Sequence, residues 1–582
     1  MCRDEADEDI TDLVAAVHMT EHTALEINFN DFEYHGISTF LQFKVAYFAC
    51  ARARLSCECV TVMRGVGLNH LRYISYNTTA AGPVRPKTSF NNTKTIAFHD
   101  TFDHPLTGNT WSSTLADGTV RFGGALTGVV WPPTLETVMF GDSFDQTLVA
   151  VPWPPRMKNI CFGAQFNQPL ARVTLPPTLL TISFGARFNQ PLAGVTLPPT
   201  LLTISFGARF NHPVAPIAWP VSLTTLSFGN DFDQAIAGAG AGFPDELQTL
   251  SFGARFNQAI VGTNWPSRLR RLSFGGDFNK PIAGVGWPNG LAEIALGTNF
   301  NQPVTGVVWP TGLVGLHLGE RFTQLVGAVV WPDSLQRMNF GQRFNSPVVH
   351  VQWPTSLKTV IFGARFNQPV IGTTWPSGVE TIAFGNSFDQ PVAGVTWPAG
   401  LLSVSFGRMF DQPVANVNWP NTLQTMTFGH YFNQPVTGVA WPQSLREITF
   451  GDRFNEAVAG TVWPDSLRQV TFGSDFDQPL AGVAWPPGVK KIAFGDGFNK
   501  PIVGLAWPDA LQILYFGRGF NKPVFGVNWP NSLQTLHFGI NFNMPVDGVN
   551  WPHTLRRVYF GVGFQQSLDN ANLPPQTRVV YL

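Results

Sequence analysis

The sequence predicts a mainly β solenoid of about twenty-one stacked coils with parallel strands, preceded by a short non-repeat segment. Three observations predict it: one motif recurs at a fixed spacing, every Trp occupies one position of that repeat, and Gly and Pro are abundant. The chain has 582 residues, which include 56 Gly, 46 Pro and 18 Trp. Because Pro interrupts helices and Gly weakens them, this composition excludes long helices over most of the chain.

The repeat begins with a Phe, the first residue of the motif F-[ND]-Q-P. Phe166, Phe188 and Phe210 lie 22 residues apart, and the same spacing continues without a break from Phe256 to Phe564. One coil therefore reads F-N-Q-P-V-x-G-V-x-W-P-x-x-L-x-x-L-x-F-G-x-x. A single coil cannot bury its aromatic side chains alone, so neighbouring coils must supply the rest of the core.

The spacing within a coil predicts one certain strand. The segment Leu423–Phe428 ends in an apolar and polar alternation with a period of two, which is a strand signal. We expect the following residue, Gly429, to adopt a turn conformation that a Cβ would hinder. Pro435 and Pro442 exclude a helix between them, and the V-x-G-V-x-W stretch that they enclose is a candidate for a second extended segment.

The Trp position belongs to the predicted core. All 18 tryptophans occupy the tenth position of the coil, from Trp111 to Trp551. In the remaining coils that position holds Leu175, Leu197, Phe243 and Leu573. A position filled only by large apolar residues is buried, and its repetition predicts a continuous aromatic spine through the array.

The Asn-Gln pair after the anchor Phe, as in Asn367-Gln368, has two interpretations. It could form a polar binding row, or an internal ladder in which Asn side chains bond the turn backbone of the neighbouring coil. We favour the ladder, because Asp at the same position can accept the same bonds. Arg often precedes the anchor Phe, but Asp takes that place in other coils, which favours a solvated edge of mixed charge over a phosphate-binding stripe.

With these motifs the sequence resembles the FNIP repeat family, whose repeats are related to leucine-rich repeats (LRRs). F-N-x-P and L-x-x-L-x-F-G recur together at the same period through residues 86–582. The family commonly has Leu before the second Pro, as in Leu175-Pro176, where most coils here have Trp. The resemblance implies an LRR-like solenoid that interacts with proteins. Some members carry an F-box before the repeats, but residues 1–85 lack its leading Leu-Pro and its leucine-rich helical pattern.

Polar side chains on the predicted strand point away from the core. In the early coils they form a ladder of small hydroxyls: Thr181, Ser183, Thr203, Ser205, Thr225, Ser227, Thr249 and Ser251. Later coils place larger and more varied groups there, which is what a protein-binding face requires. Aromatic residues and Arg are the usual anchors of interfaces. We therefore predict the binding site near Tyr515, His537, Arg557 and Tyr559.

The composition excludes several function classes. The net charge is −1, so no field of one sign attracts nucleic acid or an anionic membrane. The sequence contains no run of about twenty apolar residues, so we expect no membrane span. Five cysteines are too few for a disulfide framework, which is typical of a cytoplasmic protein. No P-loop, H-E-x-x-H or nucleophile-elbow motif is present, and we expect no catalysis, no cofactor and no metal site.

These observations together predict a scaffold that binds another protein along one face of the solenoid. One alternative is a structural or carbohydrate-facing solenoid that uses the hydroxyl ladder. A second is a substrate-recognition subunit of a ubiquitin ligase with a divergent N-terminal adaptor. The last coil ends in a strand with no cap after it, so we also expect that self-association through this edge is possible.

Residues 1–85 form the predicted non-repeat segment. Their acidic start predicts disorder, and residues 39–55 could form a short amphipathic helix that caps the first coil. Cys57 and Cys59 are one residue apart with Cys50 nearby, a spacing that does not favour zinc.

Overall fold

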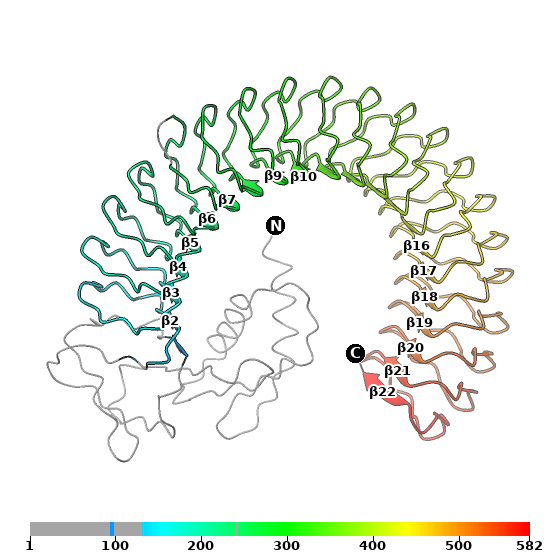
Figure 1. Cartoon of the computed structure of the whole chain (residues 1–582). Coiled ribbons are helices and arrows are strands. Elements are labelled where there is room, and N and C mark those ends of the chain that lie inside the picture. The colour runs from blue at the N-terminus through cyan, green and yellow to red at the C-terminus, as the bar shows by residue number, and fades with distance from the viewer. Residues whose placement is uncertain (1–93, 98–130, 132, 239–241, 582) are drawn as a thin grey trace, which may run out of the picture. The chain divides into compact units, whose positions relative to one another are not determined.

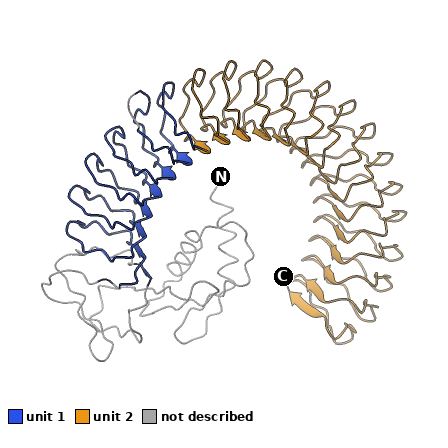
Figure 2. Cartoon of the chain, in the orientation of Figure 1, with its two compact units in different colours: residues 1–269 blue, residues 270–582 orange. Residues whose placement is uncertain are grey.

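The computed structural model describes residues 94–97, 131, 133–238 and 242–581. The chain divides into two compact units, Met1–Leu269 (unit 1) and Arg270–Leu582 (unit 2), which are coloured separately in Figure 2. The predicted helix at residues 39–55, Cys50, Cys57, Cys59 and the predicted boundary between residues 85 and 86 all lie outside the described residues.

Each described coil contributes one short strand, and neighbouring strands pair in parallel (Figure 1). Unit 1 contains β1 (Thr95–Ala97), β2 (Thr137–Met139), β3 (Asn159–Cys161), β4 (Thr181–Ser183), β5 (Thr203–Ser205), β6 (Thr225–Ser227) and β7 (Thr249–Ser251).

Unit 2 contains the later strands. They are β8 (Arg271–Ser273), β9 (Glu293–Ala295), β10 (Gly315–His317), β11 (Arg337–Asn339), β12 (Thr359–Ile361), β13 (Thr381–Ala383), β14 (Ser403–Ser405), β15 (Thr425–Thr427), β16 (Glu447–Thr449), β17 (Gln469–Thr471), β18 (Lys491–Ala493), β19 (Ile513–Tyr515), β20 (Thr535–His537), β21 (Arg557–Phe560) and β22 (Arg578–Tyr581). The predicted mainly β, LRR-like solenoid with parallel strands is confirmed.

The register between coils is constant, so equivalent residues stand side by side. Leu514 of β19 pairs with Leu536 of β20, and Leu536 pairs with Val558 of β21. All three side chains are fully buried, whereas the residues on either side of Leu514 and Leu536 are half-buried. This alternation is the period-two pattern predicted from the sequence.

Aromatic rings fill the core, as the repeat predicts. The anchor Phe432 is fully buried, and its ring centroid lies 4.0 Å from that of Phe428 in the same coil and 6.1 Å from that of Phe410 in the preceding coil. Trp397 is 7% exposed and stacks on Trp419 with ring centroids 5.3 Å apart. The predicted aromatic spine is therefore present as separate Phe and Trp columns.

The Gly that follows each strand is needed for a different reason from the one predicted. Gly429 is not among the residues with positive φ. An ideal Cβ at Gly429 would instead lie 1.7 Å from the carbonyl oxygen of Gly407, the equivalent residue of the preceding coil. The left-handed conformation belongs to another Gly of the repeat, such as Gly438 with φ 82°. Gly429 is therefore fixed by close contact between backbones.

The predicted second extended segment does not become a strand. Among the described coils, the V-x-G-V-x-W stretch is irregular throughout. Its central Gly has positive φ in most of these coils, as at Gly438, so the chain reverses direction where a strand would need continuous extension. One strand per coil is what this sequence allows.

The Asn position forms the internal ladder that we favoured. Asn455 Oδ1 accepts a hydrogen bond from the backbone N–H of Asp477 at 2.9 Å and from Gln478 Nε2 at 3.1 Å. Asp takes over the same role, since Asp389 Oδ1 accepts from Asp411 N at 3.0 Å. These side chains join coils to each other and are not a binding row.

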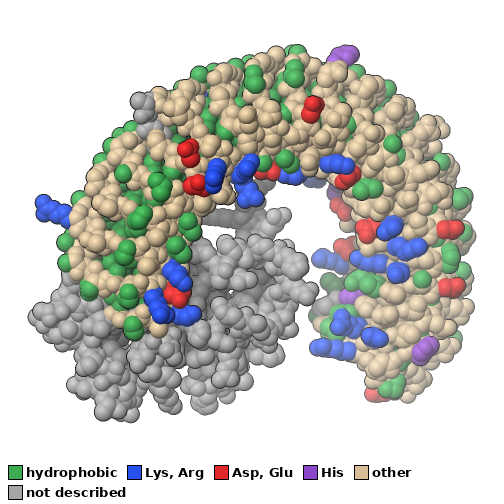
Figure 3. All heavy atoms as spheres, in the orientation of Figure 1, with side chains coloured by type: hydrophobic (Ala, Val, Ile, Leu, Met, Phe, Trp, Pro, Cys, Tyr) green, Lys and Arg blue, Asp and Glu red, His purple; other side chains and the backbone are tan. Residues whose placement is uncertain are grey.

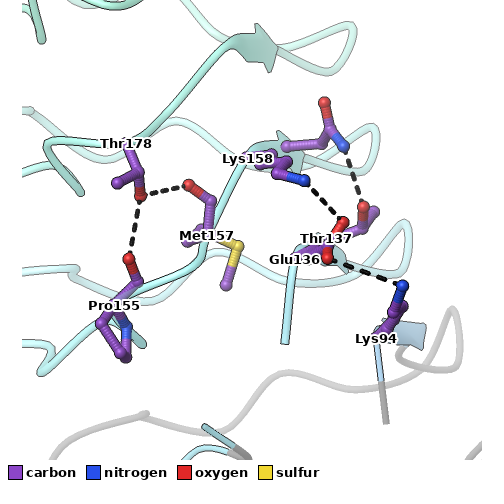
Figure 4. A network of polar contacts seen from close by, with 8 residues as sticks. Lys94, Glu136, Thr137, Pro155, Met157, Lys158 and Thr178 are labelled. Atoms are coloured by element: carbon purple, nitrogen blue, oxygen red, sulfur yellow. Dashed lines mark hydrogen bonds and ion pairs between the residues drawn. The ribbon is translucent and has the colours of Figure 1, made fainter. Parts of the chain in front are cut away.

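A second polar ladder follows the Trp-Pro or Leu-Pro pair, and it was not predicted. The hydroxyl of Thr178 donates to the carbonyl oxygen of Met157 at 2.7 Å in unit 1 (Figure 4). The same bond recurs in unit 2, where Thr422 Oγ1 donates to Leu401 O at 2.8 Å and Ser466 Oγ donates to Leu445 O at 2.7 Å. Coils that carry Thr or Ser at this position thus have side-chain bonds to their neighbour at two places, apart from the strand.

Replacing Gly429 with Ala should lower the free energy of unfolding by about 3 kcal/mol or more, because the new methyl group has no room beside the Gly407 carbonyl. Gly286→Ala is the matched control, since a Cβ there meets nothing within 4 Å. Urea unfolding followed by Trp fluorescence measures both changes. Equal stability of the two variants would contradict the backbone contact.

Asn455→Ala should cost about 1–2 kcal/mol, because the Asp477 N–H loses its side-chain acceptor, while Gln478 Nε2 keeps the backbone carbonyl of Asn455 at 2.8 Å. Asn455→Asp keeps an acceptor oxygen at that place and should stay within about 0.5 kcal/mol of the parent chain. If the Asp variant lost as much stability as the Ala variant in urea unfolding, the ladder would not be what stabilises this turn.

Candidate binding face

The candidate site lies on the outward side of the strands, where side chains differ from coil to coil. Within each unit the strands follow the inner side of the curve of the coils (Figure 2). The central residue of a strand enters the core, so its first and third residues point away from it. We call these outward residues of β18 to β22, with the residue before each strand, the C-terminal strand face.

Three predicted site residues form one column on this face. Tyr515, His537 and Tyr559 are the third residues of β19, β20 and β21, and the strand register pairs each with the next. Their ring centroids lie 4.0 Å and 3.7 Å apart, with interplanar angles of 26° and 8°. The constant register of the coils therefore turns residues 22 positions apart into a continuous stack.

Residues of the neighbouring strands adjoin both ends of the stack. The ammonium group of Lys491 lies 5.7 Å from the ring centroid of Tyr515, and Val580 of β22 pairs with Tyr559. The rings therefore present their edges and hydroxyl groups outward, because their faces contact one another. In the described part of the chain neither Tyr hydroxyl has a hydrogen-bond partner.

His537 is neutral in this stack. Burial lowers its pKa to about 4, since the rings of Tyr515 and Tyr559 exclude water from the imidazole. The nearest cationic groups on the adjoining strands are Lys491, which pairs with Ile513 of β19, and Arg557, which pairs with Thr535 of β20. At neutral pH the column is therefore an uncharged aromatic strip with basic groups beside it.

Basic side chains accompany the column. Arg557 lies two residues before Tyr559 on β21, pairs with Thr535 on one side and with Arg578 on the other, and is exposed. Lys490 and Arg556 precede their strands and are exposed as well. Figure 3 shows Lys and Arg side chains gathered along the inner side of the later coils of unit 2. All four predicted site residues are thus brought together.

Comparison with known proteins identifies the repeat. The FNIP Repeat model matches residues 144–187, 188–231, 432–475 and 476–519. The crystal structure of CroV588, described as a novel circular LRR protein, is 32% identical to this chain, with a TM-score of 0.75, and the match covers 84% of this chain and 70% of CroV588.

The chain belongs to the FNIP repeat family.

More distant structures share the LRR fold alone. The TLR13 chain of a complex with the RNA ssRNA13 is 12% identical, with a TM-score of 0.52, over 77% of this chain and 74% of that one. A chain of the Drosophila Toll–Spatzle complex is 11% identical, with a TM-score of 0.52, over 86% of this chain and 68% of that one. No curated protein matches the FNIP repeat chain.

In the earlier FNIP repeats of unit 2, several charges on the strand face are paired, although Arg271 of β8 forms no ion pair with a described residue. Arg337 bonds Glu293 across the intervening strand, where Gly315 leaves room for the contact, and Lys358 bonds Glu380 at 2.7 Å. On the C-terminal strand face, by contrast, none of the described residues forms an ion pair with Arg556, Arg557 or Arg578.

The hydroxyl ladder of unit 1 is regular. Thr181, Thr203 and Thr225 pair in register, and the three Ser residues two positions later pair in the same way. Glu136 and Lys158 each precede a strand, in neighbouring coils, and Lys158 Nζ lies 3.0 Å from Glu136 Oε2 (Figure 4). The hydrogen bond from Lys158 holds the pKa of Glu136 below its ordinary value. This face is small, uncharged and flanked by paired charges.

The residues that precede the anchor Phe form the mixed edge that the sequence predicts. Arg255 pairs with Asp231 at 3.3 Å. The sequence analysis missed Tyr431 at this edge, which has the guanidinium carbons of Arg408 and Arg453 at 5.7 Å and 4.7 Å from its ring centroid. Tyr431 is the one aromatic side chain among the described residues that precede an anchor Phe, and this was the available signal.

Residues 94–97, 131, 133–238 and 242–581 contain no apolar helix of membrane-spanning length. Within the same ranges no three His, Cys, Asp or Glu side chains gather as a metal ion requires. Burial raises the pKa of the Cys161 thiol to about 11, so this residue is no thiolate nucleophile at neutral pH.

The lowered pKa of His537 predicts a pH dependence of stability. The folded state binds this proton less readily than the unfolded state, so the stability that neutral His537 contributes is present above pH 6.5 and is lost as the pH falls toward 4. His537→Phe keeps a stacked ring and cannot titrate. The urea midpoint of the parent chain should therefore fall more between pH 7 and pH 4.5 than that of the variant. Equal falls would contradict burial of His537.

Proposed function

We propose that this FNIP repeat chain is a protein-binding scaffold without catalytic activity, and that its partner binds the C-terminal strand face. The observation that supports this proposal is the column of Tyr515, His537 and Tyr559 with Arg557 beside it. The core and the Asn ladder repeat from coil to coil, so a face that departs from the repeat is not explained by folding alone.

The chemistry of the column suits a protein interface. Tyr and Arg are enriched among the residues that dominate binding energy. The rings are already held by stacking on each other, so little side-chain entropy remains to be lost when a partner binds. Because the stack is half-buried and its edges point outward, a partner gains contact area without disturbing the core.

A structural or carbohydrate-facing role remains the second candidate, and it is supported by the in-register Thr and Ser of β4 to β7. Evenly spaced hydroxyls on a flat sheet could bond a sugar chain or an ordered water layer. The ubiquitin-ligase alternative needs residues 1–85, which lie outside the described residues, and nothing described here supports it.

We further propose that the chain is cytoplasmic, needs no cofactor and can self-associate through its C-terminal edge. Among the described strands, β22 pairs with β21 alone, and its last residue, Tyr581, is 56% exposed. Backbone groups of such an edge strand can pair with a second chain. Light scattering of the purified chain distinguishes a monomer from a dimer.

Affinity capture from a native lysate tests the binding face. The full chain, Tyr515→Ala/Tyr559→Ala and the matched control Thr203→Ala/Thr225→Ala are compared, with urea midpoints to verify folding. We expect partner proteins to be retained by the parent and the control, and reduced about tenfold or more on the Tyr variant. Retention of every protein by the Tyr variant would contradict this site. Loss on the Thr variant alone would place binding on the hydroxyl ladder.

A further inference from the structure

The charge on the C-terminal strand face and on the two coils before it is almost all of one sign. From the residue before β16 to β22, the outward positions carry seven basic side chains: Arg446, Arg468, Lys490, Lys491, Arg556, Arg557 and Arg578. Glu447 is the one acidic side chain at those positions. The whole chain has a net charge of −1, so this local excess is compensated elsewhere and is a property of this face.

Most of these groups are available to a ligand. Arg468 is the exception, because its guanidinium donates to the carbonyl oxygens of Asp465 and Leu467 at 2.8 Å and 2.9 Å. Arg556, Arg557 and Arg578 are exposed and, among the described residues, bond neither an acid nor a backbone carbonyl. Free guanidinium groups on neighbouring strands suit carboxylates, which they bind through two parallel hydrogen bonds.

The aromatic column indicates the class of anion. Single-stranded nucleic acids bind to basic grooves by stacking their bases on free aromatic faces. Here the faces of Tyr515, His537 and Tyr559 cover one another, and Lys491 covers the remaining face of Tyr515. What the column offers is ring edges and two unpaired phenol hydroxyls, which can donate hydrogen bonds to carboxylates. A peptide fits these donors better than a nucleic acid.

The dimensions fit an extended peptide. Parallel strands lie about 4.8 Å apart, so β18 to β22 span about 20 Å. An extended peptide rises about 3.3 Å per residue, and about six residues cover that length. A short acidic segment can therefore contact the basic groups of Lys490, Arg557 and Arg578 together.

We propose that the C-terminal strand face binds an extended, Asp- and Glu-rich segment of the partner protein. Carboxylates of that segment pair with Arg556, Arg557 and Arg578, and the hydroxyls of Tyr515 and Tyr559 bond the same groups or the peptide backbone. This inference rests on the proposed function and names the chemistry of the partner.

Fluorescence anisotropy tests this inference. The full chain is titrated, at low salt, against a labelled oligo-glutamate peptide of about eight residues, which is long enough to span the face. Arg557→Glu/Arg578→Glu should weaken binding about tenfold or more, whereas Arg557→Lys/Arg578→Lys keeps the charge and should weaken it less. Arg343→Glu/Arg365→Glu is the matched control, because both residues are exposed, lie at the edge before the anchor Phe and change the net charge equally. It should leave binding unchanged.

Three results would overturn the inference. The first is that the peptide does not bind. The second is that both Glu variants weaken peptide binding equally, which means that bulk charge alone attracts the peptide. The third is that oligo-thymidine of equal charge binds more tightly than the peptide, which means a nucleic-acid partner. If a lysate protein is lost on the Tyr515→Ala/Tyr559→Ala variant and oligo-glutamate still fails to bind, the face is the binding site and only its acidic ligand is wrong. If oligo-glutamate binds at Arg557 and Arg578 but no lysate protein depends on the Tyr column, the proposed function fails instead.

Discussion

The close contact between equivalent backbones of neighbouring coils is the constraint on which the rest of the structure depends. At the Gly after each strand the backbones approach so closely that even a methyl group has no room, as between Gly429 and Gly407. This contact allows no shift of one coil against the next. The Phe columns, the Asn ladder and the second polar ladder all require that fixed register, because each joins fixed positions of neighbouring coils.

A fixed interior limits where the chain can carry specificity. Core positions must match their neighbours, and positions of the Asn ladder must keep an acceptor, so the outward positions of the strands are left to vary. Register then places any varied residues in columns about 4.8 Å apart. Tyr515, His537 and Tyr559 stack for this reason, and the paired charges of Arg337 and Glu293 show the same rule applied across two coils.

Much of this could be predicted from the sequence, because the period alone states which residues become neighbours. The strand, the buried Phe and Trp, the Asn ladder and the grouping of the four site residues all follow from a 22-residue register. The sequence could not predict why position 429 requires Gly, since the requirement depends on the distance between two backbones. The Thr178 bond, the Arg408–Tyr431–Arg453 contact and the contrast between paired and unpaired charges depend on side-chain directions that a period does not give.

Hydrogen exchange measured by mass spectrometry tests the coil-to-coil register most directly. The backbone N–H of Asp477 and of Asn499 donate to side-chain oxygens of the preceding coil, at 2.9 Å and 2.8 Å, outside any strand. If register holds the coils together, these amides exchange as slowly as the strand amides of Val470 and Ile492. Fast exchange at Asp477 and Asn499 beside slow exchange in the strands would mean that the sheet alone holds the array, and would contradict this account.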